Sequence, residues 1–189
     1  MKIIFLTNNY PVARPLIEFL RFDGNEVSIM EEDITLLPFP ASAAFVSYGY
    51  RHIIGQPAIR KIKGRAVNLH IAYLPWNRGA DPNFWSWMDD TPKGVTIHWI
   101  DEGVDTGQII TRRLVDMDVE KETLASSYDK LQEAIQDLFR EEWREIKDLL
   151  IKNMGSYHTT KEKERYSGLL TAGWDTPVKN LRYDPPPKT

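Results

Sequence analysis

The stretch Ala66-Val67-Asn68-Leu69-His70 sets the fold that we expect for this chain. It predicts a strand, and side chains two positions apart on a strand point to the same face. Asn68 and His70 are therefore presented together. The run breaks at Leu74-Pro75, which places the pair at or near the strand's carboxyl end. In open parallel sheets, ligands bind at that end.

Short apolar runs and helical periods alternate around this strand. Five further strands are expected, at residues 2–7, 26–30, 43–47, 94–100 and 109–115. Helical spacing predicts a helix at 12–22, a short one at 57–63 and a long amphipathic one at 124–151, with Thr123 as its N-cap. The first strand, helix and strand form a βαβ unit. The pattern predicts an α/β, Rossmann-like fold, a mostly parallel twisted sheet flanked by helices.

Composition limits the classes of function. The chain has 189 residues, a net charge of −3 and no cysteine, which excludes a disulfide framework and thiol catalysis and gives no support for a nucleic-acid partner. The N-terminus lacks a signal-peptide pattern, and no apolar run is long enough to span a membrane. We expect a cytoplasmic enzyme with a catalytic domain at 1–154 and a short C-terminal extension at 155–189.

A carboxylate completes the set of reactive side chains. Asp105 follows in the loop Asp101-Glu102-Gly103-Val104-Asp105-Thr106-Gly107. An amide, an imidazole and a carboxylate can together stabilise an oxyanion and move a proton. The spacing of His, Asp and Glu suggests no metal site, and a Gly-x-Ser-x-Gly nucleophile motif is absent.

The sequence around these residues resembles the 10-formyltetrahydrofolate-dependent formyltransferase family. The resemblance is carried by NLHIAYLPWNRG at 68–79 and GVTIHWIDEGVDTG at 94–107. It is good from about residue 45 to 119, and in character it is closest to the amino-sugar (sugar-nucleotide) N-formyltransferases. It implies the formyltransferase fold, 10-formyltetrahydrofolate as formyl donor, and direct attack of a primary amine through a tetrahedral intermediate.

The resemblance assigns the catalytic roles to Asn68, His70 and Asp105. Asn68 and a protonated His70 would donate hydrogen bonds to the oxyanion, and one such donor is worth roughly 3–4 kcal/mol. Asp105 would keep His70 cationic, because an opposite charge raises a histidine pKa, and would take the amine's proton.

The resemblance also places the donor's pterin ring in a pocket between two loops, at 49–54 and 100–105. Its contacts there are mostly backbone groups. The side chains expected at this pocket, with Leu74 and Pro75 closing its wall, are Arg51, Ile53, Leu74, Pro75, Ile100 and Glu102.

The acceptor follows by elimination. The first loop, Thr7-Asn8-Asn9-Tyr10-Pro11, lacks the glycines of a phosphate cradle, which disfavours glycinamide ribonucleotide. The chain also lacks the large second domain of the methionyl-tRNA enzymes. A small-molecule amine remains, most plausibly an amino sugar on a nucleotide. The alternatives are a formyltetrahydrofolate hydrolase, a glycinamide ribonucleotide formyltransferase-like enzyme and a non-catalytic folate-binding protein, and a homodimer stays open.

Two features leave further questions open. The stretch 31–42 is shorter than its counterpart in the family, as if a strand–helix unit were missing, and the acceptor site is then reduced or open. Three residues also have open roles. His98 is expected to be a buried histidine with satisfied hydrogen bonds, Trp76 could line a ring-binding cleft, and Arg78 is either a surface residue or a ligand for an anionic group.

Overall fold

The sheet of this protein has six strands in the computed structural model, which describes residues 1–155 except 36, 37, 41 and 63. The strands are β1 (Lys2–Leu6), β2 (Glu26–Met30), β3 (Ala44–Tyr48), β4 (Ala66–His70), β5 (Gly94–Trp99) and β6 (Ile109–Leu114). Their order is β2-β1-β3-β4-β5-β6. β1 is parallel to β2 and β3, and β3 is parallel to β4, whereas β5 is antiparallel to both its neighbours. The predicted mostly parallel α/β sheet is confirmed.

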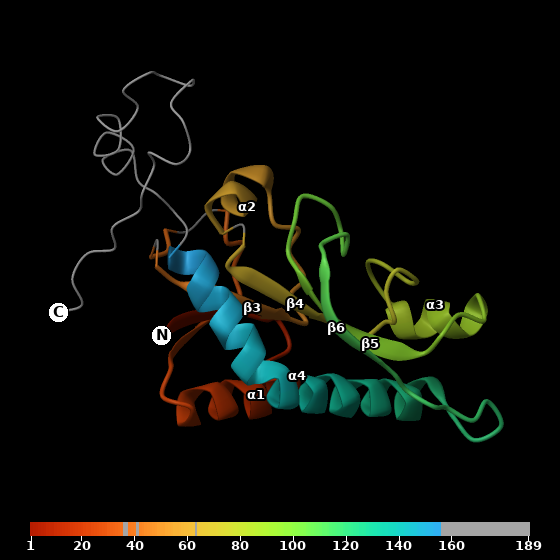
Figure 1. The fold of residues 1–189 in the computed structure, drawn as a ribbon. Coiled ribbons are helices and arrows are strands. Elements are labelled where there is room, and N and C mark those ends of the chain that lie inside the picture. Colours follow the sequence, from red (N-terminus) through yellow and green to blue (C-terminus); the bar gives the residue numbers. More distant parts are fainter. Residues whose placement is uncertain (36–37, 41, 63, 156–189) are drawn as a thin grey trace, which may run out of the picture. The chain divides into compact units, whose positions relative to one another are not determined.

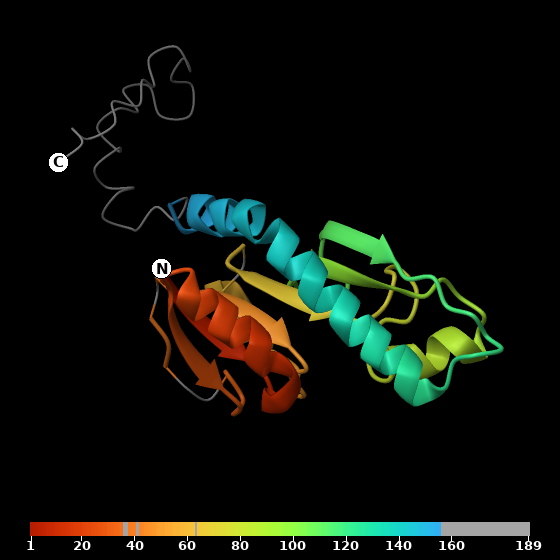
Figure 2. The ribbon, with the colours of Figure 1, turned by 90° about the horizontal axis from the view of Figure 1, so that it is seen from below.

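Helices flank both faces of this sheet. They are α1 (Tyr10–Phe22), α2 (Gln56–Ile62), α3 (Pro82–Met88) and α4 (Leu124–Gly155). Figure 1 shows α1 and α4 beneath the sheet and α2 on the opposite side. Seen from below in Figure 2, α1 and α4 lie side by side.

The two faces follow from the strand period of two. Val67 and Leu69 of β4 belong to the larger core cluster, which includes α1 and α4, whereas Ala66 belongs to the cluster around α2. Asn68 and His70 alternate with Val67 and Leu69, so they face the α2 side. The expectation that both side chains share one face is confirmed.

Helix α4 covers the lower face with one apolar stripe. Its buried side chains are Leu131, Ile135, Leu138, Phe139, Trp143, Ile146 and Leu150. A reciprocal cap starts it: Ser126 N–H donates to Thr123 Oγ1 at 3.0 Å, and Thr123 N–H donates to Ser126 Oγ at 2.9 Å. The predicted helix and its Thr123 cap are confirmed, and the helix continues to Gly155.

Helix α3 is absent from the sequence prediction because its pattern is inverted. Its buried residues are the polar Asn83 and Ser86, whereas Phe84, Trp85 and Met88 are exposed. Hydrogen bonds satisfy the buried amide: Asn83 Nδ2 donates to the Leu124 carbonyl at 3.0 Å. Apolar periodicity cannot identify a helix that is docked through side-chain hydrogen bonds.

The connection between β2 and β3 was expected to be shorter than in the family. Its described residues form neither helix nor strand, in agreement with a shortened connection. The C-terminal extension predicted at 155–189 lies outside the described residues, apart from Gly155. Among the helices that the structure describes, none combines the length and apolar character that crossing a bilayer requires.

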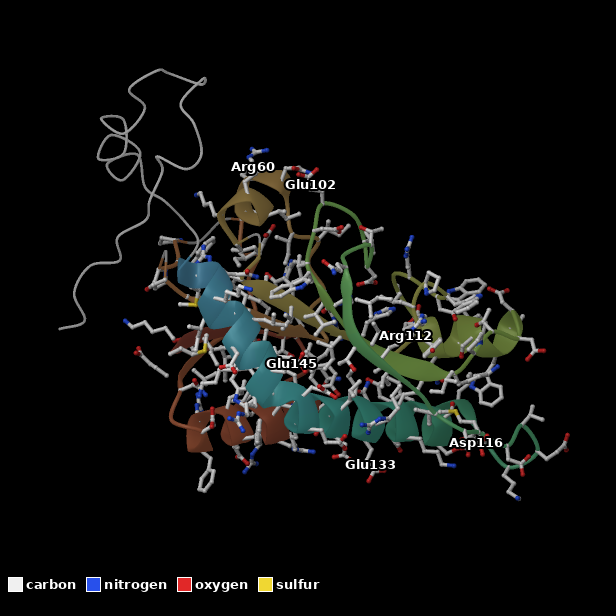
Figure 3. All side chains as sticks on the ribbon, in the orientation of Figure 1. Arg60, Glu102, Arg112, Asp116, Glu133 and Glu145 are labelled. Atoms are coloured by element: carbon white, nitrogen blue, oxygen red, sulfur yellow. The ribbon has the colours of Figure 1, made fainter. Side chains whose placement is uncertain are left out.

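We expect Ile135→Ala to destabilise the fold. Ile135 is fully buried where α4 packs on the sheet, so its truncation should lower the free energy of unfolding by about 2–5 kcal/mol in urea denaturation. Glu133→Ala, on the outer face of the same helix in Figure 3, is the control and should change it by less than about 0.5 kcal/mol. Equal effects of the two substitutions would contradict the packing described.

Candidate active site

The carboxylate of Asp105 lies among the polar side chains of β4 and β5. Asp105 Oδ1 accepts a hydrogen bond from Asn68 Nδ2 at 3.0 Å and lies 3.3 Å from His98 Nε2. Asp105 Oδ2 accepts the Gly79 N–H at 2.9 Å and lies 3.6 Å from His70 Nδ1. Asp105 therefore contacts both of the other residues predicted to be catalytic.

These contacts keep Asp105 ionised. Burial alone would raise the pKa of Asp105, but its contacts with His98, His70 and the Gly79 N–H outweigh this effect and lower the pKa to about 2. The site therefore holds a fixed negative charge at neutral pH.

The loop after β5 sets the position of this carboxylate. Asp101 Oδ1 accepts the Gly103 N–H at 3.1 Å and the Thr106 hydroxyl at 2.6 Å, which closes the turn. Asp105 takes a left-handed backbone with φ of 50°. A Cβ at Gly107 would lie 1.7 Å from the Trp99 carbonyl oxygen, so only glycine fits where the loop returns to β5.

The cross-strand register brings His98 to the same place. Asn68 pairs with His98 in the antiparallel β4–β5 ladder, so both side chains lie on one face. His98 is 2% exposed, and its Nδ1 lies 2.8 Å from the Trp99 carbonyl oxygen. The hydrogen-bonded, buried histidine expected from the sequence is found here, and its other nitrogen contacts the Asp105 carboxylate.

The protonation state of His70 differs from the sequence expectation. Burial lowers the pKa of His70 below its ordinary 6.5, and the charge of Asp105 only partly opposes this effect. The sequence analysis expected Asp105 to hold His70 cationic. That expectation considered the charge pair without the desolvation of a ring that is only 7% exposed. Burial thus favours the neutral form of His70 in the free protein.

A cavity of about 1060 Å³ opens beside these residues. Three parts of the chain surround the central triad. They are the loop after β3 (residues 49–54), the loop after β5 (residues 100–105), and a wall formed by α3 and the start of α4. Figure 3 shows Glu102 on the loop after β5, on the α2 side of the sheet. The volume is at the upper end of ordinary ligand sites, roughly 300–1,000 Å³.

Asn8 holds the loop after β3, whose residues Gly49 and Arg51 line the cavity. Its backbone N–H donates to the Gly49 carbonyl at 3.0 Å, and its side-chain Oδ1 accepts the Arg51 N–H at 2.9 Å. Asn8 Nδ2 also donates to the Glu31 carbonyl at 2.8 Å. The loops after β1, β2 and β3 are thereby joined at the carboxyl ends of their strands.

The residues expected at the donor pocket divide into two groups. Arg51, Ile53, Ile100 and Glu102 line the cavity. Leu74 and Pro75 do not. Leu74 is 2% exposed and its N–H donates to Thr96 Oγ1 at 3.1 Å, so it packs inside the protein.

Trp76 and Arg78 also lie outside the cavity lining. The Trp76 ring stacks on Tyr73, with ring centroids 6.2 Å apart. The suggestion that Trp76 lines a ring-binding cleft is therefore wrong for this cavity. The exposed side chain of Arg78 agrees with the surface alternative.

A further wall of the cavity was not predicted from the sequence. It includes Phe84 of α3 and Tyr128, Asp129 and Gln132 of α4. The sequence of α4 contained one indication of this wall: Asp129 and Gln132 are polar residues three positions apart near the start of the helix, so they lie on one face of it. Over the described residues, no three His, Cys, Asp or Glu side chains cluster as a metal site would require.

We expect Asp105→Asn to lower the pKa of His70 further. Burial lowers the pKa of His70, and the negative charge of Asp105 raises it. Without that charge, the lowering effect of burial on the pKa of His70 should be larger. Titration of the His70 ring by NMR measures the change, with the exposed Asp116→Asn as a control that should leave the titration unchanged. A rise, or no change, in the pKa of His70 in Asp105→Asn would contradict the described geometry.

Comparison with known proteins shows the family to which this chain is similar. A family model described as formyl transferase matches residues 14–141. A methionyl-tRNA formyltransferase of Clostridioides difficile is 27% identical over 149 residues, which cover 78% of this chain and 45% of that protein. The chain thus spans about half the length of the curated relative that it matches.

Two solved structures extend the comparison. The formyltransferase PseJ from Anoxybacillus kamchatkensis, in complex with UDP-4,6-dideoxy-4-formamido-L-AltNAc and tetrahydrofolate, is 42% identical with a TM-score of 0.70. The match covers 96% of this chain and 97% of that one. Phosphoribosylglycinamide formyltransferase from Streptococcus pneumoniae is 25% identical with a TM-score of 0.56, over 74% of this chain and 94% of that one. This chain belongs to the formyl transferase family.

Proposed function

We propose that this protein is an N-formyltransferase that moves a formyl group from 10-formyltetrahydrofolate to the primary amine of an amino sugar carried on a nucleotide. The observation that carries the proposal is the meeting of Asn68, His70 and Asp105 in one cavity of about 1060 Å³. A cavity of that size has room for a donor and an acceptor on either side of the three residues.

The two loops suit a flat, polar ring such as that of a pterin. Ile53, Ile54 and Ile100 offer apolar side chains, while the backbones of residues 49–54 and 100–105 offer hydrogen-bonding groups. Ile53 is 80% exposed, which a bound ring would reduce. The complex of PseJ with tetrahydrofolate supports this assignment.

The reaction requires two kinds of assistance. Formyl transfer joins the amine nitrogen to the formyl carbon, breaks the bond from that carbon to the folate nitrogen, and moves one proton from the amine to that nitrogen. Negative charge develops on the formyl oxygen, and a hydrogen-bond donor at that oxygen lowers the barrier. We assign this donor to the amide of Asn68, whose Nδ2 is oriented by its contacts with Asp105 Oδ1 at 3.0 Å and His98 Nε2 at 3.2 Å.

His70 and Asp105 move the proton. A neutral His70 can take the amine's proton, and the resulting imidazolium is stabilised by the ionised Asp105, whose Oδ2 lies 3.6 Å from Nδ1. The same proton can then be returned to the folate nitrogen. The structure thus favours a cycle in which His70 starts neutral and becomes cationic only during turnover.

The first loop argues against glycinamide ribonucleotide as acceptor. The Asn8 N–H donates to the Gly49 carbonyl, the Asn9 N–H donates to Thr7 Oγ1, and Pro11 has no N–H. These groups are unavailable to a phosphate at the start of α1, where such an anion commonly binds. Phe84 and Tyr128 instead offer rings that can pack against a sugar or a base. The UDP-sugar bound to PseJ supports a sugar nucleotide.

We expect His70→Ala and Asp105→Asn each to reduce turnover at least ~100-fold while the fold stays intact. Both side chains act on charge that develops during the reaction, so the loss should appear in kcat. Formation of tetrahydrofolate, with and without an amine acceptor, measures formyl transfer and distinguishes it from hydrolysis. The exposed Asp116→Asn is the matched control. Near-normal kcat in either site variant would show that the catalytic assignment is wrong.

The acceptor is tested with a panel of amines. We expect formylation of at least one 3- or 4-amino sugar nucleotide, detected by the mass of the formamide product. Glycinamide ribonucleotide should react far more slowly, because the Asn8 and Asn9 N–H groups of the first loop are already hydrogen-bonded within the protein and Pro11 has no N–H. Efficient formylation of glycinamide ribonucleotide alone would overturn the acceptor assignment. Release of formate without any amine would instead identify a hydrolase.

A further inference from the structure

One nitrogen of His70 is bound to the main chain. His70 Nε2 lies 2.9 Å from the carbonyl oxygen of Asn77, and the ring is 7% exposed. A carbonyl oxygen can only accept a hydrogen bond, so a favourable contact requires a hydrogen on Nε2. The opposite tautomer would place the Nε2 lone pair against the carbonyl oxygen in a buried site, where an unpaired polar contact is costly.

The other nitrogen faces the catalytic carboxylate. His70 Nδ1 lies 3.6 Å from Asp105 Oδ2, which is longer than an ordinary hydrogen bond. With Nε2 carrying its hydrogen, a neutral ring leaves Nδ1 as an open base. A proton taken up there lies beside the Asp105 charge. The charged or titratable groups that act on His70 are Asp105 and His98, whose ring centroid is 6.4 Å from that of His70.

The backbone of Asn77 is held in a rare conformation by its own side chain. Asn77 has a left-handed φ of 57°, which asparagine tolerates better than most residues. Its Oδ1 accepts a hydrogen bond from Thr91 Oγ1 at 2.6 Å. The Thr91 N–H in turn donates to the Ser86 carbonyl at 3.1 Å, which connects the contact to α3. The direction of the Asn77 carbonyl is thus set by a hydrogen bond from a distant part of the chain.

We propose that Asn77, anchored by Thr91, is a positioning residue that fixes His70 as the Nε2–H tautomer, so that Nδ1 alone takes up and returns the proton during formyl transfer. This role rests on the proposed function. The chemistry is balanced within the reaction already given. The amine loses a proton to Nδ1, the bond between the formyl carbon and the folate nitrogen breaks, and Nδ1 returns the proton to that nitrogen.

The tautomer is measured without substrates. The chain has four histidines, so ¹⁵N-histidine labelling gives few ring signals, and His70→Gln assigns those of His70. At a pH where the ring is neutral, the wild-type protein should show a protonated Nε2 and an unprotonated Nδ1. A protonated Nδ1 in the neutral ring would overturn the proposal, whether or not formyl transfer is found.

Variants then test the anchor. Thr91→Val removes the hydroxyl with little change in shape, and Asn77→Gly keeps the carbonyl and the left-handed φ but loses the anchored side chain. Both should yield mixed His70 tautomers and lower kcat about tenfold or more at unchanged KM, since misplacing a catalytic group is costly. Thr91→Ser should restore the wild-type tautomer and kcat. Thr35→Val, at an exposed threonine, should change neither.

The two variants also separate positioning from a purely structural role. A variant that is merely unstable loses native signals from the whole spectrum, whereas the proposal requires a native spectrum with an altered His70 tautomer. If Thr91→Val does not fold, Asn77→Gly provides the same test. Wild-type tautomer and kcat in a folded Thr91→Val or Asn77→Gly protein would overturn the role of Asn77. If no acceptor is ever formylated while the tautomer responds as expected, the proposed function fails and the Asn77 contact stands.

Discussion

The buried carboxylate of Asp105 is the group on which the site depends. A charge removed from water is unfavourable unless polar partners surround it, and here Asn68, Gly79 and His98 lie within 3.3 Å of its oxygens. Those partners come from β4, from the loop that follows it, and from β5. The requirement to satisfy one carboxylate therefore holds the loop that carries Asp105 against β4, the loop after β4, and β5. It also orients the amide of Asn68.

The change of strand direction at β4 makes this arrangement possible. β4 is parallel to β3 on one side and antiparallel to β5 on the other. The parallel half sends the loop after β3 to the carboxyl ends of the strands, as the folate assignment requires. The antiparallel pair sets His98 opposite Asn68 and returns the chain through the tight turn at Gly107. A uniformly parallel sheet would have placed the loop after β5 at the other end of β4.

Much of this could be read from the sequence, and the failures have physical causes. The period of two in residues 66–70 placed Asn68 and His70 on one face, and the family motif supplied Asp105. Helix α3 was missed because its buried residues are the polar Asn83 and Ser86, whereas Phe84 and Trp85 are exposed. The charge of His70 was misjudged because desolvation depends on packing that no local pattern reveals. Leu74 was placed in a cavity wall by resemblance, whereas its apolar side chain is part of the interior.

A crystal structure of the protein with tetrahydrofolate tests the central claim most directly. We expect the pterin ring between the loops at 49–54 and 100–105, with the formyl-carrying nitrogen next to Asn68, His70 and Asp105. That nitrogen should lie within about 2.6–3.2 Å of a polar atom of these side chains, or be joined to one through a single bridging water. Folate bound in this cavity with that nitrogen turned away from the three residues would contradict the account. So would folate bound at another place on the protein.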